Sequence, residues 1–214
     1  MFGKSYAAYY ESLNGSKPYE EEIQFVYQWA KNPKSILDIG CGTAHYWKHY
    51  PKDVHIVGID KSPAMIGRKK NIICADISNT KILFGRAKFD CVTALFDVLN
   101  YIPNHNWWGK LPLKQDGFFI FDVWDKTKAE QDGFKTTLKK IGKVSRIITP
   151  IRWNGSSVIL RLEVFESGEL VTQEMHTMFI YSREDIQRFC GSSFEIASIR
   201  HSETWQTFYK CRKK

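Results

Sequence analysis

A turn with two glycines, placed directly after an apolar run, is the first segment whose residue types and spacing could do chemistry. Residues 36–43 read ILDIGCGT, so a predicted strand runs into Gly40 and Gly42, and residues 44–50 can form a short helix. A strand, a glycine turn and a helix start bring backbone N–H groups close to a bound nucleotide group. A dinucleotide-binding turn would need a third glycine where this chain carries His45. The turn therefore favours another nucleotide-type cofactor.

Carboxylates stand at the ends of the next two predicted strands. Residues 54–59 end on Asp60, which lies 60 − 40 = 20 residues after Gly40. An acid at this place of a βαβ unit can accept hydrogen bonds from both ribose hydroxyls. Residues 71–75 end on Asp76, where a carboxylate can meet the exocyclic amine of an adenine. Turn formation or helix capping explains one such acid, but it does not explain the ordered set.

Two further predicted strands carry polar and aromatic groups at their ends. Residues 89–95 run into the segment FDVLNYI at 96–102, and residues 117–121 run into Asp122 and Trp124. The carboxyl ends of parallel strands meet at one edge of an open α/β sheet, which is where such sheets bind ligands. We therefore expect these groups to surround one ligand site.

In this order the motifs resemble those of the class I S-adenosylmethionine-dependent methyltransferases. The resemblance is carried by LDIGCGT, VGID, CADI and FDCVTALFDVLNYI. In addition, FDVLNYI, FIFDVW, EMHTM and the N-terminal YAAYY and KPYE segments are similar to small methyltransferases that modify saccharides on oxygen or nitrogen. The resemblance covers nearly the whole chain and is best over residues 1–125 and loosest over residues 126–170.

The resemblance implies an α/β fold, with a Rossmann-like class I methyltransferase sheet that is mostly parallel and carries an antiparallel C-terminal hairpin. We expect residues 1–214 to form a single methyltransferase domain in which residues 1–20 are an N-terminal lid segment. Alternating apolar and polar residues over 145–179 predict an inserted antiparallel β-meander of about three strands that roofs the site. The final hairpin is expected near residues 194–200 and 204–211.

The residue pattern also predicts three helices. Residues 19–31 carry apolar side chains on one face and end before Asn32 and Pro33. Ser62 followed by Pro63 is typical of a capped helix start, and Ser182 should cap a further helix.

Length and composition agree with one α/β core, because 214 residues with 43% apolar content can bury a sizeable interior. The apolar stretches are too short to span a bilayer, and the N-terminus lacks the apolar core of a signal peptide. The five cysteines form an odd set without a C-x-x-C pair, which favours free thiols in a reducing compartment. We therefore expect a soluble, cytoplasmic protein, while its oligomeric state cannot be read from the sequence.

The formal net charge of +8 has two interpretations. Basic residues gather locally, as in 139–143 and 210–214, which is typical of a solvated surface. Alternatively, the charge attracts an anionic substrate such as a nucleotide sugar, or a nucleic acid. The segment after the fourth strand has neither the Pro-Pro-aromatic motif of adenine amino methyltransferases nor the Pro-Cys nucleophile of cytosine C5 enzymes. Nucleic acid is therefore the lesser alternative to a saccharide or other small-molecule acceptor.

The resemblance further implies S-adenosylmethionine as the cofactor and S-adenosylhomocysteine as its product. The expected cofactor site comprises Tyr9, Tyr19, Asp38, Gly40, Gly42, Asp60, Asp76, Ile77 and Phe96. The tyrosines are candidates for a lid over the sulfonium, since a positive charge favours aromatic faces. We expect no metal, because the acids that can be placed lack the carboxylate cluster that chelates a divalent ion.

Methyl transfer from a sulfonium requires alignment of the nucleophile, exclusion of water and, for a hydroxyl acceptor, removal of a proton. His176 in the last meander strand is the first candidate for the base, because related proteins carry histidine in their H-x-M segment. The competing interpretation is a histidine bonded within the sheet. Asp122 and His105 are the further catalytic candidates, and His45 is another alternative.

The acceptor could be held by Asp97, Tyr101, Trp124, Arg146 and Arg152. A carboxylate can bind sugar oxygens, aromatic rings can stack on a sugar or base, and arginines can clamp a phosphate. Arg146 and Arg152 stand where some amino-sugar enzymes carry histidine, which favours a hydroxyl acceptor over an amine. The amine and the nucleic acid remain alternatives.

Overall fold

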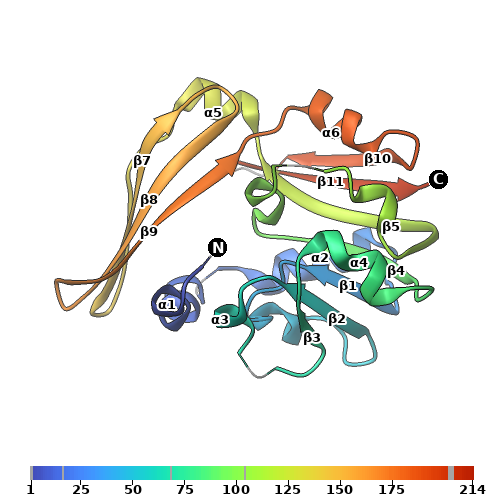
Figure 1. Cartoon of the computed structure of the whole chain (residues 1–214), viewed down its shortest axis with the longest axis horizontal. Coiled ribbons are helices and arrows are strands. Elements are labelled where there is room, and N and C mark those ends of the chain that lie inside the picture. Colours follow the sequence, from blue (N-terminus) through green and yellow to red (C-terminus); the bar gives the residue numbers. More distant parts are fainter. Residues whose placement is uncertain (1, 16, 68, 104, 202–204) are drawn as a thin grey trace.

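The computed structural model describes residues 2–15, 17–67, 69–103, 105–201 and 205–214. Of the segments predicted from the sequence, positions 1 and 16 of the N-terminal segment and position 204 of the hairpin fall outside these ranges. The strands form a seven-stranded sheet and a four-stranded sheet. In Figure 1 the smaller sheet stands at one end of the larger one, and helix α1 (Lys4–Asn14) lies between the two. Residues from both sheets line one cavity, so both contribute to the candidate site.

The larger sheet has the strand order β10-β11-β5-β4-β1-β2-β3. Its strands are β1 (Ser35–Ile39), β2 (His55–Asp60), β3 (Ile72–Cys74), β4 (Phe89–Ala94), β5 (Leu113–Trp124), β10 (Phe194–His201) and β11 (Gln206–Lys213). Strands β1 to β5 pair in parallel, whereas β11 pairs antiparallel with both β5 and β10. The predicted Rossmann-like sheet with its antiparallel C-terminal hairpin is thus confirmed.

Short helices make the connections. They are α1 (Lys4–Asn14), α2 (Tyr19–Trp29), α3 (Pro63–Ile66), α4 (Thr80–Phe84), α5 (Lys126–Asp132) and α6 (Arg183–Cys190), with the 3₁₀ helices η1 (His45–His49), η2 (Ile77–Asn79), η3 (Val98–Tyr101) and η4 (Trp108–Lys110). Ser182 caps α6 as predicted, but Ser62 makes no capping bond to α3. Within the described residues, no helix has the length and apolar composition that crossing a membrane requires.

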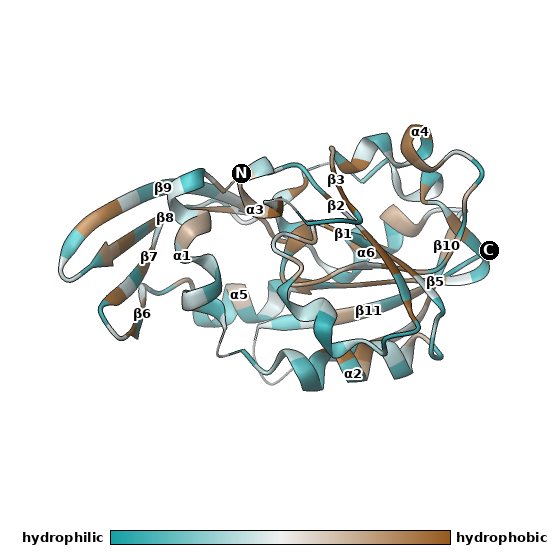
Figure 2. Ribbon diagram, turned by 90° about the horizontal axis from the view of Figure 1, so that it is seen from below, coloured by the Kyte–Doolittle hydropathy of each residue, from teal (hydrophilic) through white to brown (hydrophobic). Residues whose placement is uncertain are grey.

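Separate apolar clusters cover the two faces of the larger sheet, whose central strands are hydrophobic in Figure 2. On one face α2 buries Ile23 and Val26, which its helical period places on the same side. On the other face Trp108 of η4 and Ile186 of α6 pack over the strands. Because both faces are covered, β1 and β4 are buried along almost their whole length.

The smaller sheet is a meander of four strands: three cover the predicted range 145–179, and one more strand precedes them. They are β6 (Thr137–Ile141), β7 (Val144–Trp153), β8 (Ser157–Glu166) and β9 (Glu169–Phe179). Strand β6 was not predicted because it is an edge strand with two adjacent lysines, Lys139 and Lys140, and little burial. Every second residue of β8 is buried, and this face packs against α1 and α5.

A buried carboxylate ties three elements together beneath the glycine turn, residues 40–44. Asp38 of β1 is 1% exposed and accepts hydrogen bonds from the Tyr46 hydroxyl (2.6 Å), the Trp47 indole N–H (2.6 Å) and the Thr93 hydroxyl (2.8 Å). Burial raises the pKa of Asp38 to about 6, against the opposing effect of these three donors. Asp38 thus joins β1 to β4 and to η1, the helix that follows the turn.

We expect the substitution Asp38→Ala to destabilise the fold strongly, because it leaves three buried donors without an acceptor. Each unsatisfied donor costs about 1–3 kcal/mol, so the free energy of unfolding in urea should fall by about 3 kcal/mol or more. As a control, Tyr46→Phe removes one donor and should cost about 1 kcal/mol. Wild-type stability in Asp38→Ala would contradict the anchoring role of this carboxylate.

Candidate active site

A cavity of about 660 Å³ lies at the carboxyl ends of the parallel strands. Its walls come from the loops after β1, β2, β3 and β4, from the segment before α1 and from β9. The volume is within the range of small-molecule sites, and the position is where open α/β sheets bind ligands. One end, which we call the aromatic end, is formed by Phe2, Tyr10 and Tyr101, whose rings lie against one another.

The glycine turn also lines the cavity and adopts a backbone that only small residues accommodate. Gly40 and Gly42 have φ angles of +64° and +52°, in the left-handed region. A Cβ atom on Gly40 would lie 2.6 Å from the side chain of Val98, which also lines the cavity. The glycine at position 40 is therefore required both by the backbone and by the space.

Asp60 both holds the turn and faces the cavity. Its Oδ2 accepts the N–H of Gly42 (2.9 Å) and its Oδ1 accepts the N–H of Ser62 (2.8 Å). Burial raises the pKa of this carboxyl, while the two N–H groups act in the opposite direction. A carboxylate offers about four acceptor positions, so two remain for the hydroxyls of a ligand.

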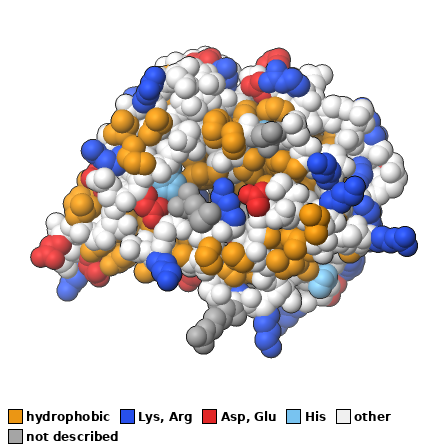
Figure 3. All heavy atoms as spheres, viewed as in Figure 1, with side chains coloured by type: hydrophobic (Ala, Val, Ile, Leu, Met, Phe, Trp, Pro, Cys, Tyr) orange, Lys and Arg blue, Asp and Glu red, His pale blue; other side chains and the backbone are white. Residues whose placement is uncertain are grey.

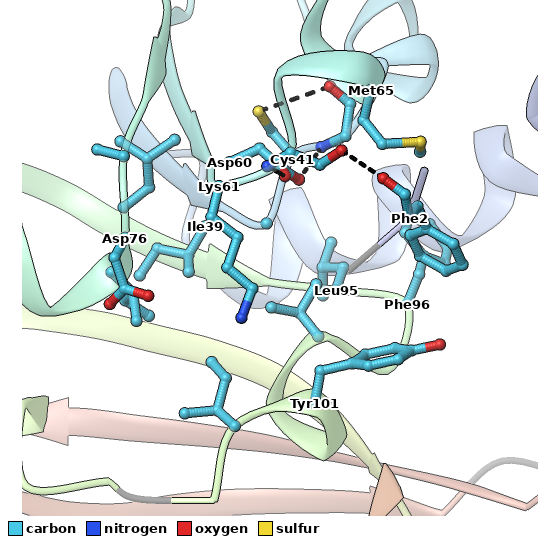
Figure 4. Close-up of a pocket in the computed structure, with 18 of the residues that line it drawn as sticks. Phe2, Ile39, Cys41, Asp60, Lys61, Met65, Asp76, Leu95, Phe96 and Tyr101 are labelled. Carbon is cyan, nitrogen blue, oxygen red and sulfur yellow. Dashed lines mark hydrogen bonds between the residues drawn. The ribbon is translucent and has the colours of Figure 1, made fainter. Parts of the chain in front are cut away.

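Asp76 marks one end of the cavity, while Phe2 and Tyr101 lie at the opposite end in Figure 4. The N–H and the hydroxyl of Ser78 both donate to Oδ1 of Asp76, at 2.9 and 2.8 Å. These bonds hold the pKa of Asp76 below its usual value, and the backbone N–H of Ser78 has the larger effect. Ile77 follows on the cavity wall. This end therefore offers an ionised carboxylate beside an apolar surface, a combination that suits an adenine.

A strained turn carries Phe96 into the cavity wall. Phe96 and Asp97 both have φ angles of +65°, which is uncommon outside glycine. Asp122, which is fully buried, accepts their backbone N–H groups at 2.6 and 3.0 Å, and Gln206 donates to both carboxylates. Burial, reinforced by the nearby Asp97, raises the pKa of Asp122 well above its usual value. Asp122 therefore positions Phe96 from behind, and it does not line the cavity.

His176 lies at the aromatic end and is 4% exposed. Its Nε2 lies 2.9 Å from Oε2 of Glu174, and its Nδ1 is buried without a hydrogen-bond partner among the described residues. The ring lies against Phe2 (4.8 Å between centroids) and Tyr101 (5.7 Å). Burial lowers the pKa of His176, partly offset by Glu174. The histidine is therefore neutral near pH 7, with one ring nitrogen unused.

Residues 9–139 match a family model described as a methyltransferase domain. This chain belongs to the methyltransferase domain family. A putative methyltransferase from Geobacillus sp. (strain WCH70) is 30% identical over 149 residues, which are 61% of this chain and 60% of that protein. The matched region thus spans about three fifths of the relative's length.

Two crystal structures illustrate the likeness of fold. An S-adenosylmethionine-dependent methyltransferase from Clostridium acetobutylicum ATCC 824 has a TM-score of 0.75 at 21% identity, over 96% of both chains. An amino pentose methyltransferase from Micromonospora echinaspora, with S-adenosylmethionine bound, has a TM-score of 0.73 at 18% identity, over 100% of this chain and 98% of the other. The predicted class I methyltransferase fold is thus confirmed, and S-adenosylmethionine is the cofactor named in the descriptions of both structures.

The residues of the cavity fit this cofactor. The glycine turn leaves space beside the backbone, Asp60 has acceptor positions left for ribose hydroxyls, and Asp76 and Ile77 suit an adenine. Tyr19 and Phe96 also line the cavity, with ring centroids 5.1 Å apart. Within the described residues, no group of three or more histidine, cysteine, aspartate and glutamate side chains could hold a metal ion.

Two residues predicted for the cofactor site lie outside the cavity of the methyltransferase. Asp38 lies beneath the glycine turn, where it accepts hydrogen bonds from three protein donors and does not line the cavity. The Tyr9 hydroxyl donates to Glu166 at 2.8 Å, away from the lining. From sequence alone, an acid before a glycine turn can point to the ligand or to the protein interior, and here it points inward.

Most residues predicted for the acceptor also lie elsewhere. Trp124 packs with Phe134 and Trp205, and Arg146 donates to the Tyr6 hydroxyl and to Asn14 of α1. Asp97 is bonded to Gln206, and Arg152 is exposed on β7. Only Tyr101 of this set lines the cavity.

The sequence reasoning also missed contributors. Phe2 lines the aromatic end, and Glu174 contacts His176. A usable signal existed for Glu174, because residues two apart on a strand point to the same face.

His105 is a core residue. The Trp108 indole donates to its Nδ1 at 3.1 Å, and Tyr181 and Phe189 pack against the ring. Burial lowers the pKa of His105 to about 4. His105 therefore stays neutral inside the aromatic cluster and does not line the cavity.

We expect Asp60→Ala to weaken S-adenosylmethionine binding at least about tenfold in calorimetry, because each lost charge-assisted hydrogen bond is worth about 1.5–3 kcal/mol. The control is Asp53→Ala, which removes an exposed carboxylate that pairs with the side chain of Lys34. Unchanged affinity in Asp60→Ala, or preferential binding of a nicotinamide dinucleotide by the wild type, would contradict the assignment.

His105 should make stability depend on pH. Its pKa is about 4 in the folded protein and 6.5 ordinarily, so the unfolded chain takes up a proton first as the pH falls. Stability from this group is therefore complete above pH 6.5 and declines as the pH falls towards 4. Asp38 has a raised pKa in the folded protein, so its contribution to stability increases as the pH falls.

Asp38 is present in both the wild type and His105→Phe, so its pH-dependent contribution cancels in the difference between their free energies of unfolding. In urea unfolding, we expect the wild type to have a higher free energy of unfolding than His105→Phe at neutral pH, and we expect this difference to shrink as the pH falls to about 4. An advantage that is the same at both pH values would show that His105 is not held neutral by burial.

Proposed function

We propose that the protein transfers the methyl group of S-adenosylmethionine to a hydroxyl of a saccharide, either a glycan or a nucleotide sugar. The observation that carries this proposal is Nδ1 of His176, a buried ring nitrogen at the cavity without a partner among the described residues. A sugar hydroxyl is too weak an acid to ionise alone, so its methylation profits from a positioned base. An amine acceptor needs no base once it is neutral.

The residues divide this task between the two ends of the cavity. Bound S-adenosylmethionine supplies a methyl group activated by its own sulfonium charge. The glycine turn, Asp60 and Asp76 would hold it, and the rings of Tyr19 and Phe96 offer faces that favour a positive charge. The aromatic end excludes water and offers flat surfaces to a sugar. His176 would accept the proton of the hydroxyl at Nδ1.

An amine acceptor is the second candidate. The neighbour from Micromonospora echinaspora is described as an amino pentose methyltransferase, which supports a saccharide and favours nitrogen. At 18% identity that likeness concerns the fold alone, so the choice between oxygen and nitrogen rests on His176. The position of a neutral histidine with an unused nitrogen favours the hydroxyl.

A nucleic-acid acceptor is less favoured. On the face shown in Figure 3, Lys and Arg side chains are scattered among acidic and hydrophobic ones. Nucleic-acid sites instead gather basic side chains into a patch or stripe. Strong salt dependence of binding to RNA or DNA would revive this alternative.

We expect His176→Ala to retain its affinity for S-adenosylmethionine and to lower kcat on a sugar hydroxyl by roughly 10²–10⁴, the range for loss of a general base. On a neutral amine acceptor the same substitution should cost far less. The wild-type rate should increase with increasing pH over a range below pH 6.5, because burial lowers the pKa of His176 from that value. The variant should lose this increase.

The matched control is His55→Ala, which removes an exposed histidine at the start of β2. It should leave both kcat and the pH profile unchanged. Full activity with an unchanged profile in His176→Ala would reduce His176 to a structural residue of β9 and remove the main support for a hydroxyl acceptor.

A further inference from the structure

The carboxylate of Glu174 makes two hydrogen bonds that join separate parts of the site. Its Oε1 accepts the backbone N–H of Gly3 at 2.9 Å, and its Oε2 lies 2.9 Å from Nε2 of His176. Glu174 and His176 are two residues apart on β9, so both side chains project from the same face of the strand. The side chains of Glu174 and His176 are 14% and 2% exposed, which shields the pair from water.

The contact between Glu174 and His176 determines which ring nitrogen carries the proton. An ionised carboxylate only accepts hydrogen bonds, so Nε2 of a neutral His176 must be the protonated nitrogen. Nδ1 then carries a free lone pair, and it is the atom without a partner among the described residues. The titratable side chains placed against the ring are Glu174 on its own strand and Tyr101 from η3.

The same carboxylate fastens the N-terminal segment over the cavity. The carbonyl of Phe2 accepts the hydroxyl of Ser62 at 2.8 Å, a bond drawn dashed in Figure 4. The next residue, Gly3, donates to Glu174. Residues 2–3 therefore connect the loop after β2 with β9, and the Phe2 ring lines the cavity and touches His176. This use of the Ser62 hydroxyl explains why it does not cap α3.

We propose that Glu174 is the positioning residue of the site: it fixes His176 with its proton on Nε2, and the docked N-terminal segment fixes Glu174. The base and the closed segment then form one unit, because a single carboxylate accepts from both. The inference rests on the proposed role of His176 as the base, but the state of the ring can be measured without any acceptor.

The test uses ¹⁵N NMR of the histidine ring nitrogens in the full chain loaded with S-adenosylhomocysteine, with the His176 signals assigned by comparison with His176→Ala. In the wild type we expect the pattern of a neutral ring with its proton on Nε2. In Glu174→Gln an NH₂ group, which only donates, takes the place of one of the two oxygens, so the amide cannot accept at both the Gly3 and the His176 position in this geometry. The pattern should then change to the other tautomer or to a mixture, or the Gly3 amide should exchange its hydrogen faster.

The matched control is Glu169→Gln, which makes the same change of charge at an exposed position of β9. It should leave both the ring pattern and the exchange of Gly3 unchanged. On a sugar hydroxyl acceptor, Glu174→Gln should lower kcat at least about tenfold while cofactor affinity stays the same, as for loss of the correct tautomer of a base.

The outcomes separate this inference from the proposed function. A proton on Nδ1 of His176 in the wild type overturns the inference, and this measurement does not require that Glu174→Gln folds. A Glu174→Gln variant with the ring pattern and the Gly3 exchange of the wild type also overturns it. If the ring pattern changes in Glu174→Gln but His176→Ala remains fully active, Glu174 still positions the ring and the hydroxyl chemistry fails instead.

Discussion

Buried carboxylates that hold backbone turns are the constraint on which the site depends. Asp38 accepts from β4 and from the helix after the glycine turn, and thereby sets the start and the end of that turn. Asp122 does the same for the left-handed turn at Phe96 and Asp97, through two backbone N–H groups. Neither acid lines the cavity, yet between them they hold two of its walls. In the low dielectric of the interior such hydrogen bonds are strong, and a buried donor or acceptor without a partner destabilises the fold.

The sheet and the cofactor end of the cavity could be predicted from the sequence because their signals are local. Apolar runs that end on Asp60 and Asp76 indicate both the strands and the edge at which they meet. The direction of a side chain is not local, which is why Asp38 and Asp122 were placed with the ligand rather than beneath it. His105 and His176 look alike in sequence, and only tertiary packing puts one among aromatic rings and the other at the cavity.

The aromatic end illustrates the same limit. Arg146 and Trp124 are residue types that bind phosphates and sugars, but Arg146 of β7 contacts α1, and Trp124 at the end of β5 packs with neighbouring rings. The residues that do face His176 come from the N-terminal segment and from η3, which are far apart in sequence. Their convergence depends on the register of β9 and on the bonds of Phe2 and Gly3, which no periodicity encodes.

The most direct test of the account is transfer of a deuterated methyl group from labelled S-adenosylmethionine to a panel of nucleotide sugars and glycans, with the label located by tandem mass spectrometry. The panel should pair each sugar with its amino counterpart, so that oxygen and nitrogen compete in the same framework. The account predicts label on a hydroxyl oxygen of a saccharide. Label found only on amine nitrogen, or only on acceptors other than saccharides, would contradict it.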